Sequence, residues 1–173
     1  AAEAIESLSL HGLSKHAWKR YFAEASWKYD AIFAGFKYNM TDIQSAIGIQ
    51  QLKKLGRFLE KRAAIAAAYN KAFDKLPELV TPKARKYARH PWHLYPLMID
   101  PKKLSINRDQ FLEALVKEGI GRSVHFLPVH LFTFYRKKFG FKRGDFPVAE
   151  KLAGEILSLP MYPELKIKEI KYI

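Results

Sequence analysis

Histidine is the side chain in this sequence best suited to acid–base or metal chemistry near neutral pH. Two pairs lie close in sequence: His125 and His130 in the segment HFLPVH, and His90 and His93 on either side of Trp92. A histidine pair needs at least one further ligand to hold a zinc ion. The chain has no cysteine and no convincing third ligand near either pair, so we predict no metal site. Residue type alone favours packed or surface histidines, with Trp92 anchoring a strand.

A second group of residues suits an anion. Lys37 and Asn39 come just before a predicted helix, for which Thr41 is a good N-cap. Free N–H groups at a helix N-terminus, together with a nearby side-chain amide, make a reasonable phosphate site. An asparagine there can also be a plain turn residue before the cap, and the residues alone favour that interpretation.

A long helix is predicted directly after this loop. Asp42 suits the first turn of a helix, where the helix dipole favours an anion. Apolar residues then recur at helical spacing from Ile43 to Phe73, and the pattern stops before Pro77. Gly56 interrupts the run and indicates either a bend or a close helix contact.

The rest of the chain alternates predicted strands and helices, which indicates an α/β class. Pro96 in the first strand favours an edge position in the sheet. Asn107 is a plausible N-cap for the next helix, and Gly119 ends it. In order, we predict a surface loop or linker at 76–91, a strand at 93–99, a helix up to 119, a strand at 123–127, a helix at 145–158 that starts near Pro147, and a short helix from 167.

The chain is strongly basic. Its 173 residues include 30 Lys and Arg against 17 Asp and Glu, a formal net charge of +13, which favours anionic partners such as nucleic acid or phosphate-bearing small molecules. The densest basic groups, Arg57, Lys61, Arg62 and residues 137–143, match no nucleic-acid motif, so we interpret them as solvated faces. No apolar run is long enough for a membrane span, and no secretory pattern opens the sequence. We expect a cytoplasmic protein.

Five stretches carry a resemblance to a known family. Residues 35–44 (GFKYNMTDIQ), continued by AIG at 46–48 and QL at 51–52, resemble the DegT/DnrJ/StrS group of sugar-nucleotide aminotransferases. Four others match in order and spacing over nearly the whole chain: HGLSKHAWKRY (11–21), HPWHLYPLMID (90–100), EGIGRSVHFLPVHLFTFYR (118–136) and GDFPVAEKLAGEILSLPMYPEL (144–165). The KYN motif and the WHLYPL stretch look most like enzymes that aminate UDP-linked 4-keto sugars.

The resemblance implies a fold: α/β, the C-terminal small domain of a fold type I pyridoxal-phosphate (PLP) aminotransferase, preceded by the end of the large domain and a long interdomain helix. We therefore expect residues 1–75 to hold the end of the large domain, a dimer-crossing loop and the interdomain helix. Residues 76–173 would form the small α/β domain.

The same resemblance implies that part of the chemistry lies elsewhere. In the family, the Schiff-base lysine and the acidic partner of the pyridine nitrogen lie upstream of the HG motif, and no lysine here has the family's Ser/Gly-rich context. We therefore assign no catalytic residue. We expect a C-terminal half that is inactive alone: a proteolytic or cloned fragment, a truncated reading frame, or one chain of a split enzyme.

Binding residues are carried over from the resemblance. It assigns the cofactor phosphate of the neighbouring subunit to Asn39, with Lys37 as a second candidate; many relatives have Asn-x-Arg where this chain has KYN. It places His125 and Phe126 beside the substrate, also in trans. Weaker candidates in the same segment are His130 and Tyr135.

The implied activity is PLP-dependent transfer of an amino group, from glutamate, to a nucleotide-linked keto sugar in cell-surface polysaccharide or amino-sugar biosynthesis. The implied partners are a nucleotide-sugar substrate and a second copy of the chain in a homodimer, with no specific nucleic acid and no membrane. Two alternatives remain: a non-catalytic regulatory or interaction relative, and a basic nucleic-acid-binding module. We also expect exposed apolar surface over residues 1–60, which the large domain covers in the family.

Overall fold

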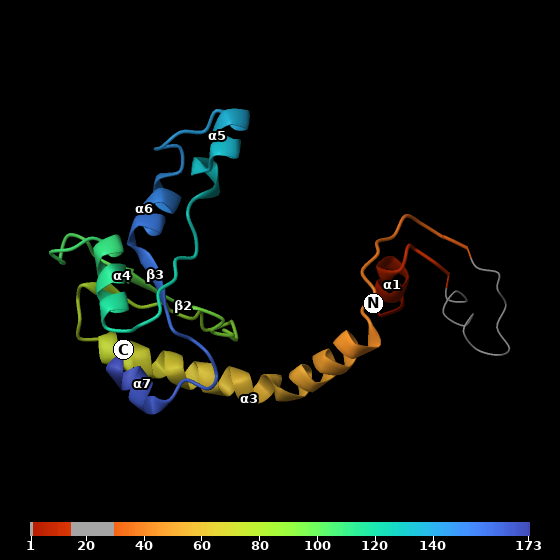
Figure 1. Ribbon diagram of the computed structural model, residues 1–173, viewed down its shortest axis with the longest axis horizontal. Helices are drawn as coiled ribbons and strands as arrows, with labels where there is room; N and C mark the ends of the chain where they lie inside the picture. Colours follow the sequence, from red (N-terminus) through yellow and green to blue (C-terminus); the bar gives the residue numbers. More distant parts are fainter. Residues whose placement is uncertain (1, 15–29) are drawn as a thin grey trace. The chain divides into compact units, whose positions relative to one another are not determined.

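The computed structural model describes residues 2–14 and 30–173 (Figure 1). The chain divides into two compact units, residues 1–53 and 54–173, and each is described by itself. The 15–21 part of the HG stretch lies outside the described residues.

The first unit is built around a tight backbone crossing. Helix α1 (Ala2–Ser9) ends in a turn at His11 and Gly12, where φ is 58° and 70°. The segment before the long helix returns alongside this turn: the N–H of His11 donates to the carbonyl of Phe36 at 2.8 Å, and Leu10 pairs with Lys37 in an isolated bridge. The loop that carries Lys37 is therefore tied to the end of α1.

Glycine is required where the two segments cross. A Cβ on Gly12 would lie 1.9 Å from the carbonyl oxygen of Phe33, and a Cβ on Gly35 would lie 2.1 Å from the backbone nitrogen of Gly12. Gly12 also has the positive φ that residues with a side chain rarely adopt. The glycines of the HG and GFKYN motifs thus share one structural cause, a close approach of two backbones.

Helix α3 (Asp42–Phe73) runs without interruption over the predicted range. Thr41 and Gln44 cap it reciprocally: the N–H of Gln44 donates to the Thr41 Oγ1 at 3.3 Å, and the N–H of Thr41 donates to the Gln44 Oε1 at 2.9 Å. No described atom lies within 4 Å of a Cβ added at Gly56, so the described residues make no close helix contact there.

The second unit contains a three-stranded antiparallel sheet of order β1-β2-β3, formed by β1 (Leu79–Val80), β2 (Tyr95–Ile99) and β3 (Ile156–Leu159). The strand predicted at 93–99 is therefore confirmed, but its edge position is wrong. Pro96 fits a central strand because β1 pairs only with Met98 and Ile99. On the other side, Pro96 faces Ser158, whose N–H donates to Ser123 instead.

Two further predictions about this region are wrong. Residues 123–127 form no strand; only Ser123 pairs, in an isolated bridge with Ser158. The helix predicted at 145–158 stops early, since α6 (Pro147–Glu155) gives way directly to β3. The apolar residues of β3 continue the helical spacing, and pairing with β2 overrides that local pattern.

The remaining helices follow their local signals more closely. Asn107 and Gln110 form a capping box before α4 (Arg108–Lys117), and Gly119 follows with a φ of 73°, as predicted. A short helix α7 (Ile167–Tyr172) is also confirmed. Three elements were not predicted from the sequence: β1, the 3-10 helix η1 (Val129–Leu131) and helix α5 (Thr133–Phe139).

The core of the second unit lies between the sheet and the helices. Alternate residues of β2 are buried, and Tyr95 packs against Tyr69 of α3 with ring centroids 4.9 Å apart. Leu112 of α4 and Leu157 of β3 complete the centre of this core. The buried hydroxyl of Tyr95 has a hydrogen-bond partner, because it donates to the Asn70 Oδ1 at 2.7 Å.

The N-terminal part of the chain exposes apolar surface, as expected. In the described residues up to 60, large hydrophobic side chains are exposed in α1, in the loop before α3 and along α3: Ile5, Leu8, Ile32, Phe33, Phe36, Tyr38, Met40, Ile43, Ile47, Ile49, Leu52 and Leu55. Across the described parts of the chain, no helix is both long enough and apolar enough to cross a membrane.

Candidate functional site

The predicted phosphate-binding residues sit on a braced loop. The side chains of Lys37 and Asn39 are both exposed. Between them, the N–H of Tyr38 donates to the carbonyl of Ser9 at 2.8 Å, and the Tyr38 ring stacks on Phe36 with centroids 5.0 Å apart. The loop backbone is thus held while an ammonium and an amide stay free to meet a ligand next to the N-terminus of α3.

These residues fit one part of PLP. An ammonium and an amide are suitable donors to phosphate oxygens. A lysine that forms a Schiff base is usually desolvated or lies beside another cation, and none of the lysines in residues 2–14 and 30–173 is buried. Lys61 is the half-buried exception among exposed lysines, and its amine is paired with Glu164 at 2.7 Å. The donors of Lys37 and Asn39 therefore suit the phosphate of the cofactor.

The predicted substrate-side residues lie beside Ser158 of β3. The Nδ1 of His125 is 2.9 Å from the Ser158 Oγ. The Ser123 Oγ lies against the side of the same ring, 3.0 Å from the Nε2 and 3.5 Å from the Nδ1. Phe126 is 74% exposed, and its ring meets that of His125 edge-on with centroids 4.8 Å apart. The Nδ1 of His125 thus has a defined partner in the same chain, and Phe126 is open to a ligand.

The weaker candidate His130 has a structural position. It is buried, and its Nε2 lies 3.0 Å from the Glu150 Oε1. A carboxylate only accepts hydrogen bonds, so the ring donates from Nε2 when Glu150 is ionised. Glu150 also accepts from the N–H groups of Gly144 and Phe146. His130 therefore ties η1 to the start of α6.

The other candidates do not form a metal centre. Tyr135 is exposed and stacks with Phe139 at the surface of α5. The Nδ1 of His90 accepts the N–H of Trp92 at 3.0 Å, while His93 is exposed. Within residues 2–14 and 30–173, no three His, Asp or Glu side chains are grouped so that they could hold a metal ion.

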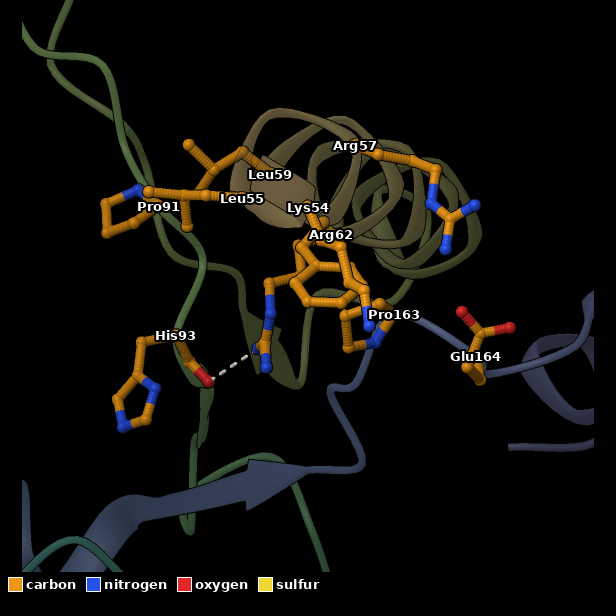
Figure 2. Close-up of a pocket in the computed structure, with 10 residues that line it drawn as sticks. Lys54, Leu55, Arg57, Leu59, Arg62, Pro91, His93, Pro163 and Glu164 are labelled. Atoms are coloured by element: carbon orange, nitrogen blue, oxygen red, sulfur yellow. Dashed lines mark hydrogen bonds between the residues drawn. The ribbon is translucent and has the colours of Figure 1, made fainter. Parts of the chain in front are cut away.

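The interpretation of Arg62 as part of a solvated face is wrong. Its Nη1 lies 3.0 Å from each of three carbonyl oxygens, those of Trp92, His93 and Met161. Figure 2 shows the guanidinium beside the His93 carbonyl, beneath α3. Helix periodicity does place Arg62 on the face of Ile65, Ala66 and Tyr69, which is the signal that indicates an inward side chain.

A cavity of about 520 Å³ adjoins this arginine (Figure 2). Its charged lining residues are Lys54, Arg57, Arg62 and Glu164. The hydrogen bond from Lys61 holds the pKa of Glu164 below its ordinary value, and the charges of Lys61 and Arg57 act in the same direction. Neither His125 nor Lys37 lines this cavity.

A three-stranded antiparallel sheet that packs with helices, preceded by a 32-residue helix, defines an α/β protein. The model of the DegT/DnrJ/EryC1/StrS aminotransferase family matches residues 1–173. The chain belongs to this family.

Curated relatives match nearly the whole chain. Protein MJ1066 of Methanocaldococcus jannaschii is 54% identical over 164 residues, which are 95% of this chain and 42% of the relative. The spore coat polysaccharide biosynthesis protein SpsC of Bacillus subtilis is 45% identical, over 98% of this chain and 44% of its own length. A UDP-4-amino-4,6-dideoxy-N-acetyl-beta-L-altrosamine transaminase of Campylobacter jejuni is 34% identical, over 99% of this chain and 43% of its own. The chain thus spans less than half the length of these relatives.

Solved structures confirm the α/β fold as part of a larger chain. PseC of Helicobacter pylori, an aminotransferase involved in the biosynthesis of pseudoaminic acid, superposes with a TM-score of 0.79 at 25% identity, over 98% of this chain and 43% of PseC. The PLP form of Spr1654 from Streptococcus pneumoniae superposes with a TM-score of 0.78 at 28% identity, over 97% of this chain and 40% of that protein.

Proposed function

We propose that this chain is the C-terminal part of a cytoplasmic, PLP-dependent aminotransferase that moves an amino group from glutamate to a nucleotide-linked keto sugar. The observation that carries the proposal is the family match over residues 1–173. The names of two relatives, a spore coat polysaccharide biosynthesis protein and a UDP-amino-sugar transaminase, support amino-sugar chemistry. The PLP form of a structural neighbour supports the cofactor.

The domain assignment is part of the same proposal. Residues 1–75 would supply the end of the large domain, the loop at 35–42 and the interdomain helix, and residues 76–173 would supply the small domain. The exposed apolar side chains before residue 60 support this arrangement, because an apolar surface of this extent is typical of a contact with another part of a protein.

Within this enzyme, the chain has binding roles. Bound PLP supplies the electron sink that makes amino transfer possible. Lys37 and Asn39 would hold the cofactor phosphate of the second subunit of a homodimer. Their loop is braced against α1, so the two donors are positioned before the phosphate arrives, and their binding loses little conformational entropy.

The proposed substrate contacts come from His125 and Phe126, which lie beside Ser158 of β3. Phe126 offers an exposed ring on which a sugar or a base can pack. His125 would donate to, or accept from, an oxygen of the nucleotide sugar, and its ring is already oriented by Ser158. Proton transfer at the reacting carbon is assigned to a lysine outside these residues.

The experiment is an amino-transfer assay on the whole protein that contains residues 1–173. With PLP, glutamate and a UDP-linked 4-keto sugar, we expect mass spectrometry to detect the UDP-amino sugar together with 2-oxoglutarate. The 173-residue chain alone, as a control, should form neither. A whole protein that shows no yellow PLP absorbance and transfers no amino group would contradict the proposal and favour a regulatory relative.

A further inference from the structure

The two serines that contact His125 come from different parts of the chain for a definite geometric reason. Ser123 and His125 are two positions apart, and side chains at this spacing share a face in an extended segment. Ser158 stands opposite Ser123 in an isolated antiparallel bridge, and its N–H donates to the Ser123 carbonyl at 2.9 Å. The bridge therefore brings all three side chains together.

The two contacts differ in their surroundings. Ser158 belongs to β3 and is only 5% exposed, and its neighbours Leu157 and Leu159 are buried in the core. Its hydroxyl has one fixed place, 2.9 Å from the His125 Nδ1. Ser123 lies outside any strand and is partly exposed, and its hydroxyl, 3.0 Å from the Nε2 and 3.5 Å from the Nδ1, is in line with neither nitrogen.

We infer that Ser158 is a positioning residue for substrate binding and that Ser123 is not. Ser158 holds the Nδ1 of His125 in both the free and the bound state. The Nε2 is then left to a hydroxyl or phosphate oxygen of the nucleotide sugar, because the Ser123 hydroxyl is not in line with it. The inference rests on the proposed function, because it takes His125 to be the substrate-side residue.

A hydroxyl partner suits this role. A serine hydroxyl donates or accepts as required, so both tautomers of the neutral ring can keep the contact with Ser158. A substrate phosphate oxygen only accepts, so it selects the tautomer with its proton on Nε2, and Ser158 then donates to Nδ1. Substrate binding would therefore fix a tautomer that the free protein leaves open.

The first test needs no substrate. The ring nitrogen shifts of His125 can be followed by NMR in the 173-residue chain, with the signal assigned by its loss in His125→Gln. In Ser158→Ala, we expect the Nδ1 signal to change. Ser123→Ala removes a hydroxyl that lies against the side of the ring and should change the Nδ1 signal less. An unchanged Nδ1 signal in Ser158→Ala would overturn the positioning role.

The second test uses the whole protein. Loss of one neutral hydrogen bond corresponds to about a threefold to tenfold change in affinity. We expect Ser158→Ala to raise KM for the UDP-linked keto sugar by about this factor with little change in kcat, and Ser123→Ala to leave KM unchanged. Equal increases in KM for both variants would overturn the distinct role of Ser158. If Ser158→Ala does not fold, Ser158→Thr keeps the hydroxyl and should retain the wild-type Nδ1 signal and KM.

The two levels of the account can fail separately. If His125→Gln leaves KM unchanged while Ser158→Ala still alters the Nδ1 signal, His125 is not a substrate residue, and the role of Ser158 in substrate binding fails with it. If His125→Gln raises KM but Ser158→Ala changes neither signal nor KM, the substrate role of His125 holds and the inference about Ser158 is wrong.

Discussion

The Nη1 of Arg62 lies 3.0 Å from the carbonyl oxygen of Met161, a residue 99 positions later in the chain. The same nitrogen contacts the carbonyls of Trp92 and His93. One charged group on α3 thus contacts both the segment before β2 and the segment after β3, within the second unit.

Removal of this contact should destabilise the second unit. Arg62→Ala leaves the carbonyls of Trp92 and Met161, whose contacts are partly buried, and the exposed carbonyl contact of His93 without their charged donor, and hydrogen bonds to charged groups contribute about 1.5–3 kcal/mol. We expect the free energy of unfolding to fall by about 2–4 kcal/mol in urea titrations. Arg57→Ala, an exposed arginine on the same helix, is the matched control and should change it by about 0.5 kcal/mol or less. Equal effects of the two variants would show that Arg62 is a surface charge after all.

Substitution by alanine should change stability in opposite directions at Gly12 and Gly56. At Gly12, a Cβ would lie 1.9 Å from the Phe33 carbonyl oxygen, at a φ of 70°, so Gly12→Ala should unfold the first unit or displace the loop with Lys37. At Gly56 nothing described lies within 4 Å, and alanine in a helix interior is favoured by about 1 kcal/mol. Gly56→Ala should therefore raise the thermal midpoint of the chain. A gain in stability from Gly12→Ala would disprove the close crossing.

Alkaline stability should depend on a buried tyrosine. Burial raises the pKa of Tyr95 from 10.0 to about 12, and burial also raises the pKa of Tyr69. The folded state keeps the Tyr95 proton more tightly than the unfolded state, so this stabilisation is complete below pH 10 and is lost as pH rises towards 12. An ultraviolet titration of the nine tyrosines should show a late phase that coincides with unfolding. Tyr95→Phe should reduce that phase, and an unchanged amplitude would count against it.

Acid stability should depend on Glu150. The hydrogen bond from His130 lowers the pKa of Glu150 below its ordinary 4.5, and the N–H groups of Gly144 and Phe146 act in the same direction. Its stabilisation is therefore present above pH 4.5 and is lost as pH falls through the lower folded value. Glu150→Gln should lower the urea midpoint at neutral pH and flatten its decline in acid.

Glu164 provides the control for this prediction. Its pKa is also lowered, by the hydrogen bond from Lys61, but the carboxylate is 71% exposed, and ion pairs at the surface contribute little. Glu164→Gln should change the acid profile less than Glu150→Gln does. A larger effect of Glu164→Gln would contradict the structural role assigned to His130 and Glu150.

The phosphate assignment separates two neighbouring residues. In the whole protein, loss of a charge-assisted contact to phosphate should weaken PLP binding about tenfold to a hundredfold. Lys37→Met and Asn39→Ala, measured by dialysis against graded PLP, would show which side chain makes the contact. Lys53→Met, an exposed lysine on α3, should leave PLP retention unchanged. If neither Lys37→Met nor Asn39→Ala alters retention, the loop does not bind the phosphate.

Local signals predicted several helix ends well, but they did not predict α5 and they predicted the sheet poorly. Thr41, Asn107 and Gly119 act on their immediate neighbours, so a sequence window contains the whole of their physical effect. Pro96 and β3 depend on partners far along the chain: Pro96 is tolerated in a central strand because β1 is short and Ser158 bonds elsewhere. No window around Pro96 contains that information.

The candidate site divides in the same way. The histidines and the KYN loop were found from residue type and family resemblance. The residues that orient the two histidine rings lie far away in sequence: Ser158 is 33 positions from His125, and Glu150 is 20 positions from His130. Neither residue belongs to a sequence pattern that predicts this contact. Arg62 was misjudged because charge suggests solvent, whereas its helical phase places it beside buried residues.

The central claim is that these residues form the C-terminal half of a PLP enzyme whose cofactor lysine lies elsewhere. The most direct measurement is borohydride reduction of the PLP-loaded whole protein, followed by mass spectrometric mapping of the modified lysine. The account predicts a pyridoxyl group on a single lysine outside residues 1–173. A pyridoxyl group on a lysine within these residues, or no stable incorporation at all, would contradict it.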